Sequence, residues 1–153
     1  MGHMAGSRIM IPAIQWGLRL VLGGVFVYAG VVKIYDPAGF LADIESYRLL
    51  PYFAAVATAL YLPWLEVVAG AALWIRRAYR GSLAILLVLT FLFGVFITSA
   101  WIRGLDISCG CFGVTDTSEA NYPWLLTRDV LILLGLACLV WFEQVTGRRM
   151  SNG

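Results

Sequence analysis

Long apolar segments separated by short polar ones dominate this chain. Between Arg80 and Arg103 lie 22 residues without a single charge. A helix of about 20 apolar residues is long enough to cross the ~30 Å hydrocarbon core of a bilayer. Three other segments of similar length carry only a few charges. The pattern therefore predicts four membrane-spanning helices, at about 14–34, 51–75, 81–102 and 124–146.

A shorter amphipathic segment, DPAGFLADIESYRLLP, separates the first two expected spans. Asp36 can cap a helix and Pro37 suits its first turn. Apolar residues then recur at helical spacing against polar ones, at Phe40, Leu41, Ile44 and Tyr47. We expect a short helix lying flat on the membrane surface, although a plain connector fits the same pattern. The predicted fold class is all-α: a four-helix integral membrane bundle with this interfacial helix, forming one transmembrane domain over residues 1–153.

Composition supports a membrane protein and narrows its chemistry. The chain is 61% hydrophobic and 13% charged, whereas soluble domains are about 25% charged. Residues 1–4 resemble the remnant of a cloning tag, and His3 among them is the single histidine. Setting these residues aside excludes Ser-His-Asp catalysis, histidine-ligated haem and histidine-containing zinc sites. The net charge of +2 gives no indication of nucleic-acid binding, and we expect none.

Four spans place both termini on one side of the membrane. Basic residues are more frequent in the short segments on that side, which predicts that both termini are cytoplasmic. Tryptophans also fall near both expected membrane surfaces, as in an aromatic belt. The segment after the third span, which contains SCGCFG, would then lie outside. We therefore expect a multi-pass protein of the cytoplasmic (inner) membrane.

Cys109 and Cys111 stand one glycine apart in that outer segment. Outside the cytoplasm, neighbouring thiols form disulfides or exchange them with partners. A disulfide that closes so short a loop adds little stability and is liable to be strained, which favours redox exchange over a structural role. Capture of a soft metal ion by two thiolates is the alternative. The third cysteine, Cys138, is expected to be a small buried residue of the last span.

Several charged residues lie inside the expected spans or at their ends, and four of them suggest specific roles. Arg19 and Glu66 fall within the first two spans, where charges are costly and usually paired. We expect a structural ion pair between them. Arg128 and Asp129 begin the last span, near the cysteines; a cation there could lower a thiol pKa, or simply extend its side chain to the interface. Small residues such as Gly23, Gly30 and Gly70 predict close helix contacts.

The chain resembles the methylamine-utilisation MauE family, within the wider group of DoxX-like four-helix membrane proteins. The matching stretches are RLVLGGVFVYAGVVKIYDPAGF at 19–40, SYRLLP at 46–51, LPWLEVVAGAALW at 62–74 and RGLDISCGCFG at 103–113. The resemblance implies disulfide formation or thiol redox handling in partners outside the membrane. It places the redox pair at Cys109 and Cys111 and the intramembrane charges at Arg19 and Glu66. Quinone-linked disulfide generators use two cysteine pairs, whereas this chain has one.

These observations predict a thiol–disulfide oxidoreductase that oxidises a periplasmic thioredoxin-like partner, or a secreted cysteine-containing substrate, and passes electrons to a membrane quinone, ubiquinone or menaquinone. A quinone needs an apolar slot with a few polar anchors. The candidates near the cysteines are Trp101, Phe112, Tyr122, Trp124 and Arg128. A protein that binds or transports a soft metal ion such as copper or mercury is one alternative, and a non-catalytic assembly subunit is the other. We expect oxidation of the partner rather than its reduction, because strained disulfides are the more oxidising couples.

Overall fold

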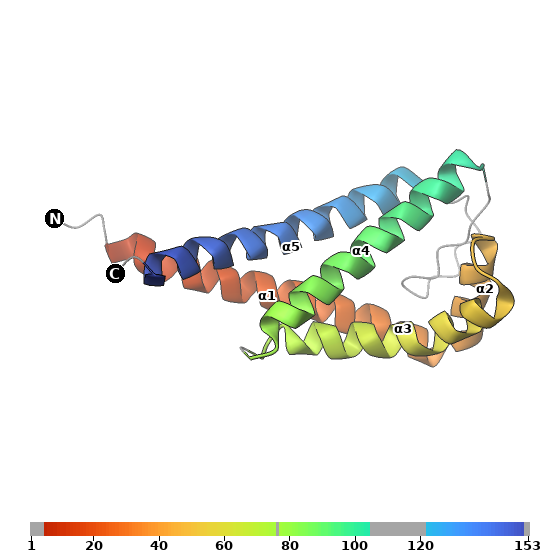
Figure 1. Ribbon diagram of the computed structural model, residues 1–153, viewed down its shortest axis with the longest axis horizontal. Coiled ribbons are helices and arrows are strands. Elements are labelled where there is room, and N and C mark those ends of the chain that lie inside the picture. The colour runs from red at the N-terminus through yellow and green to blue at the C-terminus, as the bar shows by residue number, and fades with distance from the viewer. Residues whose placement is uncertain (1–4, 76, 105–121, 152–153) are drawn as a thin grey trace.

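The computed structural model describes the backbone of residues 5–75, 77–104 and 122–151, and the side chains within residues 14–75, 77–104 and 123–144. Five helices account for nearly all of this part of the chain. In order they are α1 (Ala5–Tyr35), α2 (Pro37–Ser46), α3 (Tyr52–Ala72), α4 (Tyr79–Ile102) and α5 (Tyr122–Ser151). Figure 1 shows α1, α3, α4 and α5 running along one another, with α2 across one end.

The all-α membrane fold expected from the sequence is confirmed. Four helices are long and apolar enough to cross a membrane, over Ile14–Tyr35, Tyr52–Ala72, Tyr79–Ile102 and Pro123–Gln144. In hydrocarbon the backbone must satisfy its hydrogen bonds within the segment, which a helix does. α1 and α5 extend beyond their membrane-length portions at the end of the bundle that carries the termini (Figure 1). The protein is therefore a multi-pass membrane protein.

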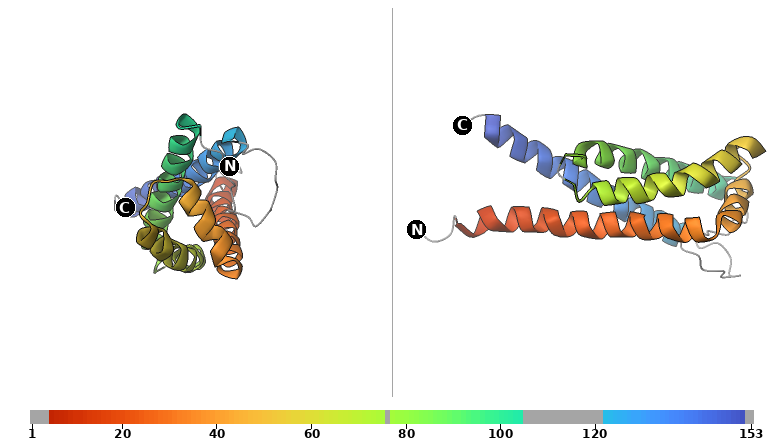
Figure 2. Two further views of the ribbon diagram at one scale, coloured as in Figure 1. Left: turned by 90° about the vertical axis from the view of Figure 1, so that its right-hand side faces the viewer. Right: turned by 90° about the horizontal axis from the view of Figure 1, so that it is seen from below.

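The long helices pack mainly as two pairs. α1 packs most extensively on α3, and α4 on α5, with fewer contacts between α3 and α4. The N-terminal end of α1 and the C-terminal end of α5 lie at one end of the bundle, and α2 lies at the other (Figures 1 and 2). The end of α4 and the start of α5 lie at the same end as α2 (Figure 1). The segment that joins them contains the cysteine pair.

Small residues set the register of α1 against α3. A Cβ added to Gly23 would lie 2.7 Å from the Gly70 carbonyl oxygen, and one added to Gly30 would lie 2.6 Å from the Pro63 carbonyl oxygen. Both contacts join residues whose numbers sum to 93, so the helices run antiparallel with residue n of α1 level with residue 93 − n of α3. Such close backbone approach compensates for the lack of a hydrophobic driving force between helices in lipid.

The predicted interfacial helix is present as α2, and the predicted cap forms. An Asp36 carboxylate oxygen accepts a hydrogen bond from the Gly39 backbone N–H, at 2.9 Å, and Pro37 occupies the first turn. The end of α2 is tied to the end of α4, because Arg103 Nη1 donates a hydrogen bond to the Tyr47 carbonyl oxygen, at 3.1 Å. α2 therefore covers the end of the bundle beside the start of the cysteine segment.

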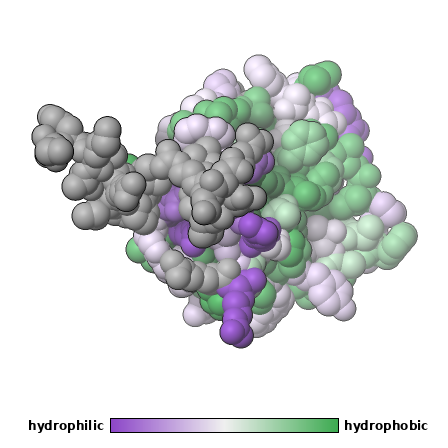
Figure 3. Space-filling model, turned by 60° about the vertical axis from the view of Figure 1, so that its left-hand side comes forward, coloured by the Kyte–Doolittle hydropathy of each residue, from purple (hydrophilic) through white to green (hydrophobic). Residues whose placement is uncertain are grey.

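The outer surface of the bundle suits contact with lipid. Large apolar side chains on every long helix are exposed, for example Val21, Val68, Val88 and Leu131. Hydrophobic side chains form much of the surface visible in Figure 3, and strongly hydrophilic residues gather in a few places. Inside, leucines from α1, α4 and α5 and the residue directly after α3 form one buried cluster, which includes Leu22, Leu73, Leu86 and Leu136.

Candidate functional site

A buried ion pair joins α1 to α3. The Lys33 ammonium donates hydrogen bonds to both carboxylate oxygens of Glu66, at 2.7 and 2.8 Å. Each side chain is only 3% exposed. The ammonium also faces two aromatic rings, lying 5.0 Å from the centroid of Phe40 and 4.8 Å from that of Phe93. Burial of either charge alone would strongly destabilise the protein. The attraction between Lys33 and Glu66 offsets the cost of removing both charges from water, so each side chain can be buried only with its partner.

The predicted pairing of Arg19 with Glu66 is wrong. The Arg19 guanidinium carbon lies 3.7 Å from the centroid of the Tyr79 ring and 5.7 Å from that of Trp16. By the register of α1 and α3, Glu66 is level with residue 27, which is eight residues or about 12 Å from Arg19. Side chains tilt toward the N-terminus of their own helix, so in this antiparallel pair Glu66 points away from Arg19 and toward Lys33.

Arg128 and Asp129 bring a second ion pair to the same region. Arg128 Nη2 donates to Asp129 Oδ1 at 3.1 Å, and the Asp129 side chain is 6% exposed. Both pairs line a cavity of about 50 Å³ between α1, α3, α4 and α5. We call Lys33, Glu66, Arg128 and Asp129 the charge cluster and this space the central cavity. Thr90 and Phe93 also line it.

The charge cluster has the chemistry of a buried, electrically balanced site. Two cations and two anions sum to zero when all four are ionised, which keeps the cost of burial down. The second Asp129 oxygen, Oδ2, is buried and has no hydrogen-bond partner among the described residues. A cavity of this size is large enough for a water molecule, which needs at least ~10–15 Å³. The cluster can therefore accept a hydrogen bond from a small donor within the membrane.

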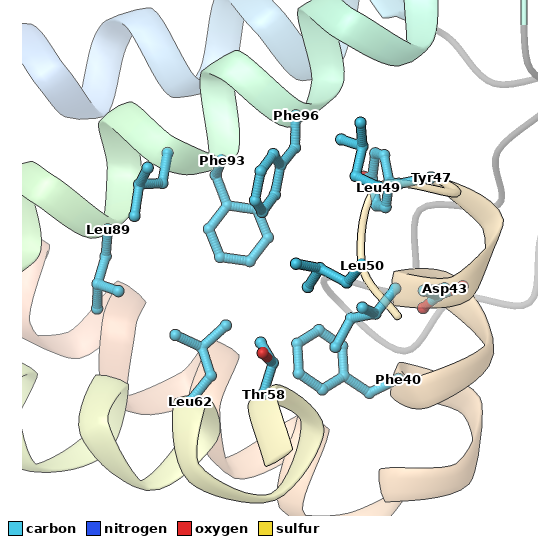
Figure 4. A pocket seen from close by; sticks show the side chains of 12 residues that line it. Phe40, Asp43, Tyr47, Leu49, Leu50, Thr58, Leu62, Leu89, Phe93 and Phe96 are labelled. Carbon is cyan, nitrogen blue, oxygen red and sulfur yellow. The ribbon is translucent and has the colours of Figure 1, made fainter. Parts of the chain in front are cut away.

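A larger and almost wholly apolar cavity lies between α2, α3 and α4, with a volume of about 230 Å³. We call it the aromatic cavity, because Phe40, Tyr47, Phe93 and Phe96 line it. Figure 4 shows the two α4 rings, Phe93 and Phe96, facing α2 and α3 across an open centre. Phe93 lines the central cavity as well. The Phe93 side chain is therefore shared by the two cavities.

The residues predicted to form a quinone slot are not brought together where the structure describes them. Trp101 is 51% exposed and Trp124 is 67% exposed, as expected of residues at a membrane surface. Arg128 instead points inward and lines the central cavity. Phe112 and the side chain of Tyr122 lie outside the described residues. None of these described candidates lines the aromatic cavity, which sequence reasoning did not predict.

Cys109 and Cys111 also lie outside the described residues, so their geometry stays a prediction. They belong to the segment between Ile102, the last residue of α4, and Tyr122, the first of α5. Cys138 is half-buried on α5 with its thiol free. Within the described ranges, no group of three or more histidine, cysteine, aspartate or glutamate side chains could hold a metal ion.

Comparison with known proteins identifies the family. The family described as "Methylamine utilisation protein MauE" matches residues 11–142. The chain is 33% identical to the methylamine utilization protein MauE of Paracoccus versutus over 127 residues. This alignment covers 82% of this chain and 67% of the relative. The chain is 30% identical over 136 residues to MauE of Methylorubrum extorquens, covering 88% and 72%, and 28% identical over 130 residues to MauE of Paracoccus denitrificans, covering 84% and 69%. No solved structure matches it significantly. The resemblance read from the sequence motifs is thus confirmed, and the chain belongs to the MauE family.

Proposed function

We propose that this protein is a membrane thiol–disulfide oxidoreductase of a methylamine-utilisation system, which oxidises a thioredoxin-like or secreted partner through Cys109 and Cys111. The observation that supports the proposal most is the position of the Cys-Gly-Cys pair. The pair belongs to the segment between α4 and α5, two membrane-spanning helices, and α4 ends and α5 begins at the end of the bundle where α2 lies (Figure 1). A short cysteine pair at such a place suits exchange with a soluble partner better than it suits packing.

The exchange proceeds between sulfur atoms. A partner thiolate attacks one sulfur of the Cys109–Cys111 disulfide, and the second cysteine leaves as a thiolate. The partner's other thiol then attacks the mixed disulfide. Its disulfide forms and the pair is left reduced, so two electrons and two protons have passed to the protein. A bound quinone would accept both as the Cys109–Cys111 disulfide is restored.

The orientation of the protein follows from the same reasoning. α1 begins and α5 ends at one end of the bundle (Figure 1), where Arg77 and Arg80 lie near the loop between α3 and α4. The positive-inside rule favours a cytoplasmic location for that end. The cysteine segment would then face the periplasm or the cell exterior. That is where a thioredoxin-like partner and an oxidising environment occur together.

The experiment compares the wild type with Cys109→Ser, Cys111→Ser and Cys138→Ser in quinone-containing proteoliposomes. A thioredoxin-like protein with reduced cysteines serves as the partner, and its remaining thiols are measured over time. We expect both loop variants to lose partner oxidation completely and to remain folded, because exchange needs both sulfur atoms. Cys138→Ser is the matched control and should keep full activity. In intact cells a membrane-impermeant thiol reagent should label the reduced loop pair.

Three results would contradict the proposal. Full activity in both loop variants would exclude the disulfide mechanism. Stoichiometric copper in protein purified under reducing conditions, lost in both loop variants, would favour the metal-binding alternative, since two thiolates are soft-metal ligands. Purified protein with neither a titratable redox couple nor quinone reduction would instead fit an assembly subunit.

A further inference from the structure

The aromatic cavity has the lining of a site for a flat apolar ring. Three phenylalanines and Tyr47 face it, and Leu50 and Leu62 complete much of its wall (Figure 4). Aromatic rings stack on planar ligands with a gain of about 0.5–1.5 kcal/mol beyond the area they bury. The polar group on the α3 side, the Thr58 hydroxyl, already donates a hydrogen bond to the Ala54 carbonyl at 2.8 Å. The cavity therefore offers mainly stacking surface, with Asp43, Tyr47 and Thr58 as its few polar side chains.

The charges around this cavity disfavour a phospholipid headgroup. Asp43 is the one charged residue among the described residues that line it, and it is an anion. The nearest buried cation, Lys33, is held by Glu66 and lies behind the rings of Phe40 and Phe93. A phosphate would meet a like charge at Asp43 and find no cation lining the wall. A neutral ligand meets neither obstacle.

The size of the cavity suits the ring of a lipid-soluble molecule rather than a whole ligand. Sites that enclose a drug-sized molecule have volumes of ~300–1,000 Å³, and this cavity has about 230 Å³. It lies between membrane-spanning helices whose outer faces meet lipid. A ring can therefore occupy the cavity while an attached hydrocarbon tail stays in the bilayer.

We propose that the aromatic cavity binds the ring of an isoprenoid quinone, and that Phe93 is its principal stacking residue. The proposal rests on the function proposed above, which requires a lipid-soluble electron acceptor. It places that acceptor between α2, α3 and α4, at the end of the bundle where the cysteine segment begins. Phe93 lines both cavities, and the Lys33 ammonium of the charge cluster faces the rings of Phe40 and Phe93.

Binding is tested directly, in nanodiscs made from quinone-free phospholipid. A short-tailed ubiquinone analogue is titrated by calorimetry, with empty nanodiscs subtracted. Leu62→Trp fills the cavity, whereas Leu60→Trp adds the same ring to the same helix at a residue that is 55% exposed. We expect at least a tenfold loss of affinity for Leu62→Trp and less than a twofold change for Leu60→Trp. Phe93→Leu keeps an apolar wall but removes the stacking ring, and should weaken binding about 2- to 12-fold.

The outcomes separate this proposal from the proposed function. Wild-type affinity in a folded Leu62→Trp variant and in Phe93→Leu would overturn the site. So would native mass spectra in which a phospholipid occupies the protein and excess quinone does not displace it. Cys109→Ser and Cys111→Ser should bind the quinone analogue as the wild type does, because they lack only the thiol exchange. Full partner oxidation by both cysteine variants, with intact quinone binding, would thus leave the site standing and refute only the thiol chemistry.

Discussion

Removal of one partner of the Lys33–Glu66 pair should destabilise the bundle far more than removal of both. The ammonium lies 2.7 and 2.8 Å from the two carboxylate oxygens, and each side chain is 3% exposed. Both charges stay buried while the helices stay packed. Lys33→Met and Glu66→Met each leave one buried charge without its partner, whereas the double variant leaves two apolar side chains of similar length.

The magnitude follows from two opposing terms. The shorter contact between the Lys33 ammonium and Glu66 is 2.7 Å. At that distance and an effective dielectric constant of ~20, two unit charges attract by about 6 kcal/mol. Desolvation costs several kcal/mol for each ion, so the intact pair contributes little net stability. In a single variant the attraction is lost while the cost of burying the remaining ion stays. We therefore expect each single variant to lose about 3–5 kcal/mol and the double variant to lie near the wild type.

The assay is reversible unfolding in mixed micelles, with SDS added to a mild detergent and helix content followed by circular dichroism. A loss of 3 kcal/mol changes the ratio of folded to unfolded protein more than about 100-fold. The exposed Arg80–Glu143 pair is the control, since Arg80 is 82% exposed, and its variants should show less than ~1 kcal/mol of coupling. Single losses below 1 kcal/mol, or losses that simply add in the double variant, would refute the buried pair.

Two smaller changes test the packing and the capping of the helices. Gly23→Ala should cost about 1–3 kcal/mol in the same unfolding assay, because its Cβ would lie 2.7 Å from the Gly70 carbonyl oxygen. The control Gly24→Ala, whose Cβ would meet nothing within 4 Å, should be neutral or slightly stabilising. Equal losses of stability in the two variants would contradict the register of α1 against α3. Asp36→Ala removes the side chain that accepts from the Gly39 N–H and should cost α2 about 1 kcal/mol, seen as roughly fivefold faster amide exchange in α2. Unchanged exchange there would show that the cap does not hold the helix.

The elements that could be predicted from the sequence are those fixed by local chemistry. Apolar runs of membrane length with few or no charges predicted helices. In lipid, a single segment can satisfy its own backbone hydrogen bonds only as a helix. α2 was predictable because Asp36 and Pro37 together mark the start of a helix. Asp36 is the N-cap residue, Pro37 follows it in the first turn, and the capped N–H belongs to Gly39, three residues after Asp36. The bounds differ chiefly at the termini, where α1 and α5 run past the lengths needed to cross the membrane.

The Lys33–Glu66 pair could not be predicted from the sequence by depth alone, because a residue's depth in the membrane can be obtained there only by counting from the ends of its span. That count places a residue to within a turn or two, whereas a salt bridge requires atoms within 4 Å. The missing information was the register of α1 on α3, which the contacts of Gly23 with Gly70 and of Gly30 with Pro63 supply. The sequence did carry a usable signal. Gly23 and Gly30 stand seven residues apart in α1, and their partners Pro63 and Gly70 stand seven residues apart in α3. Aligning them, with each side chain tilted toward its own N-terminus, selects Lys33 over Arg19.

The aromatic cavity could not have been predicted from the sequence, and the reason is specific to membrane proteins. In a soluble helix, apolar residues mark the buried face, because the rest of the helix meets water. Here Leu86 is fully buried while Val88, two residues later, is 58% exposed, and both are equally at home in lipid. Phe93 and Phe96 therefore looked like any other apolar residues of α4. Polar residues discriminate better: each buried charge had to find a partner inside the bundle, so Lys33, Glu66 and Asp129 identify its interior more reliably than any apolar side chain does.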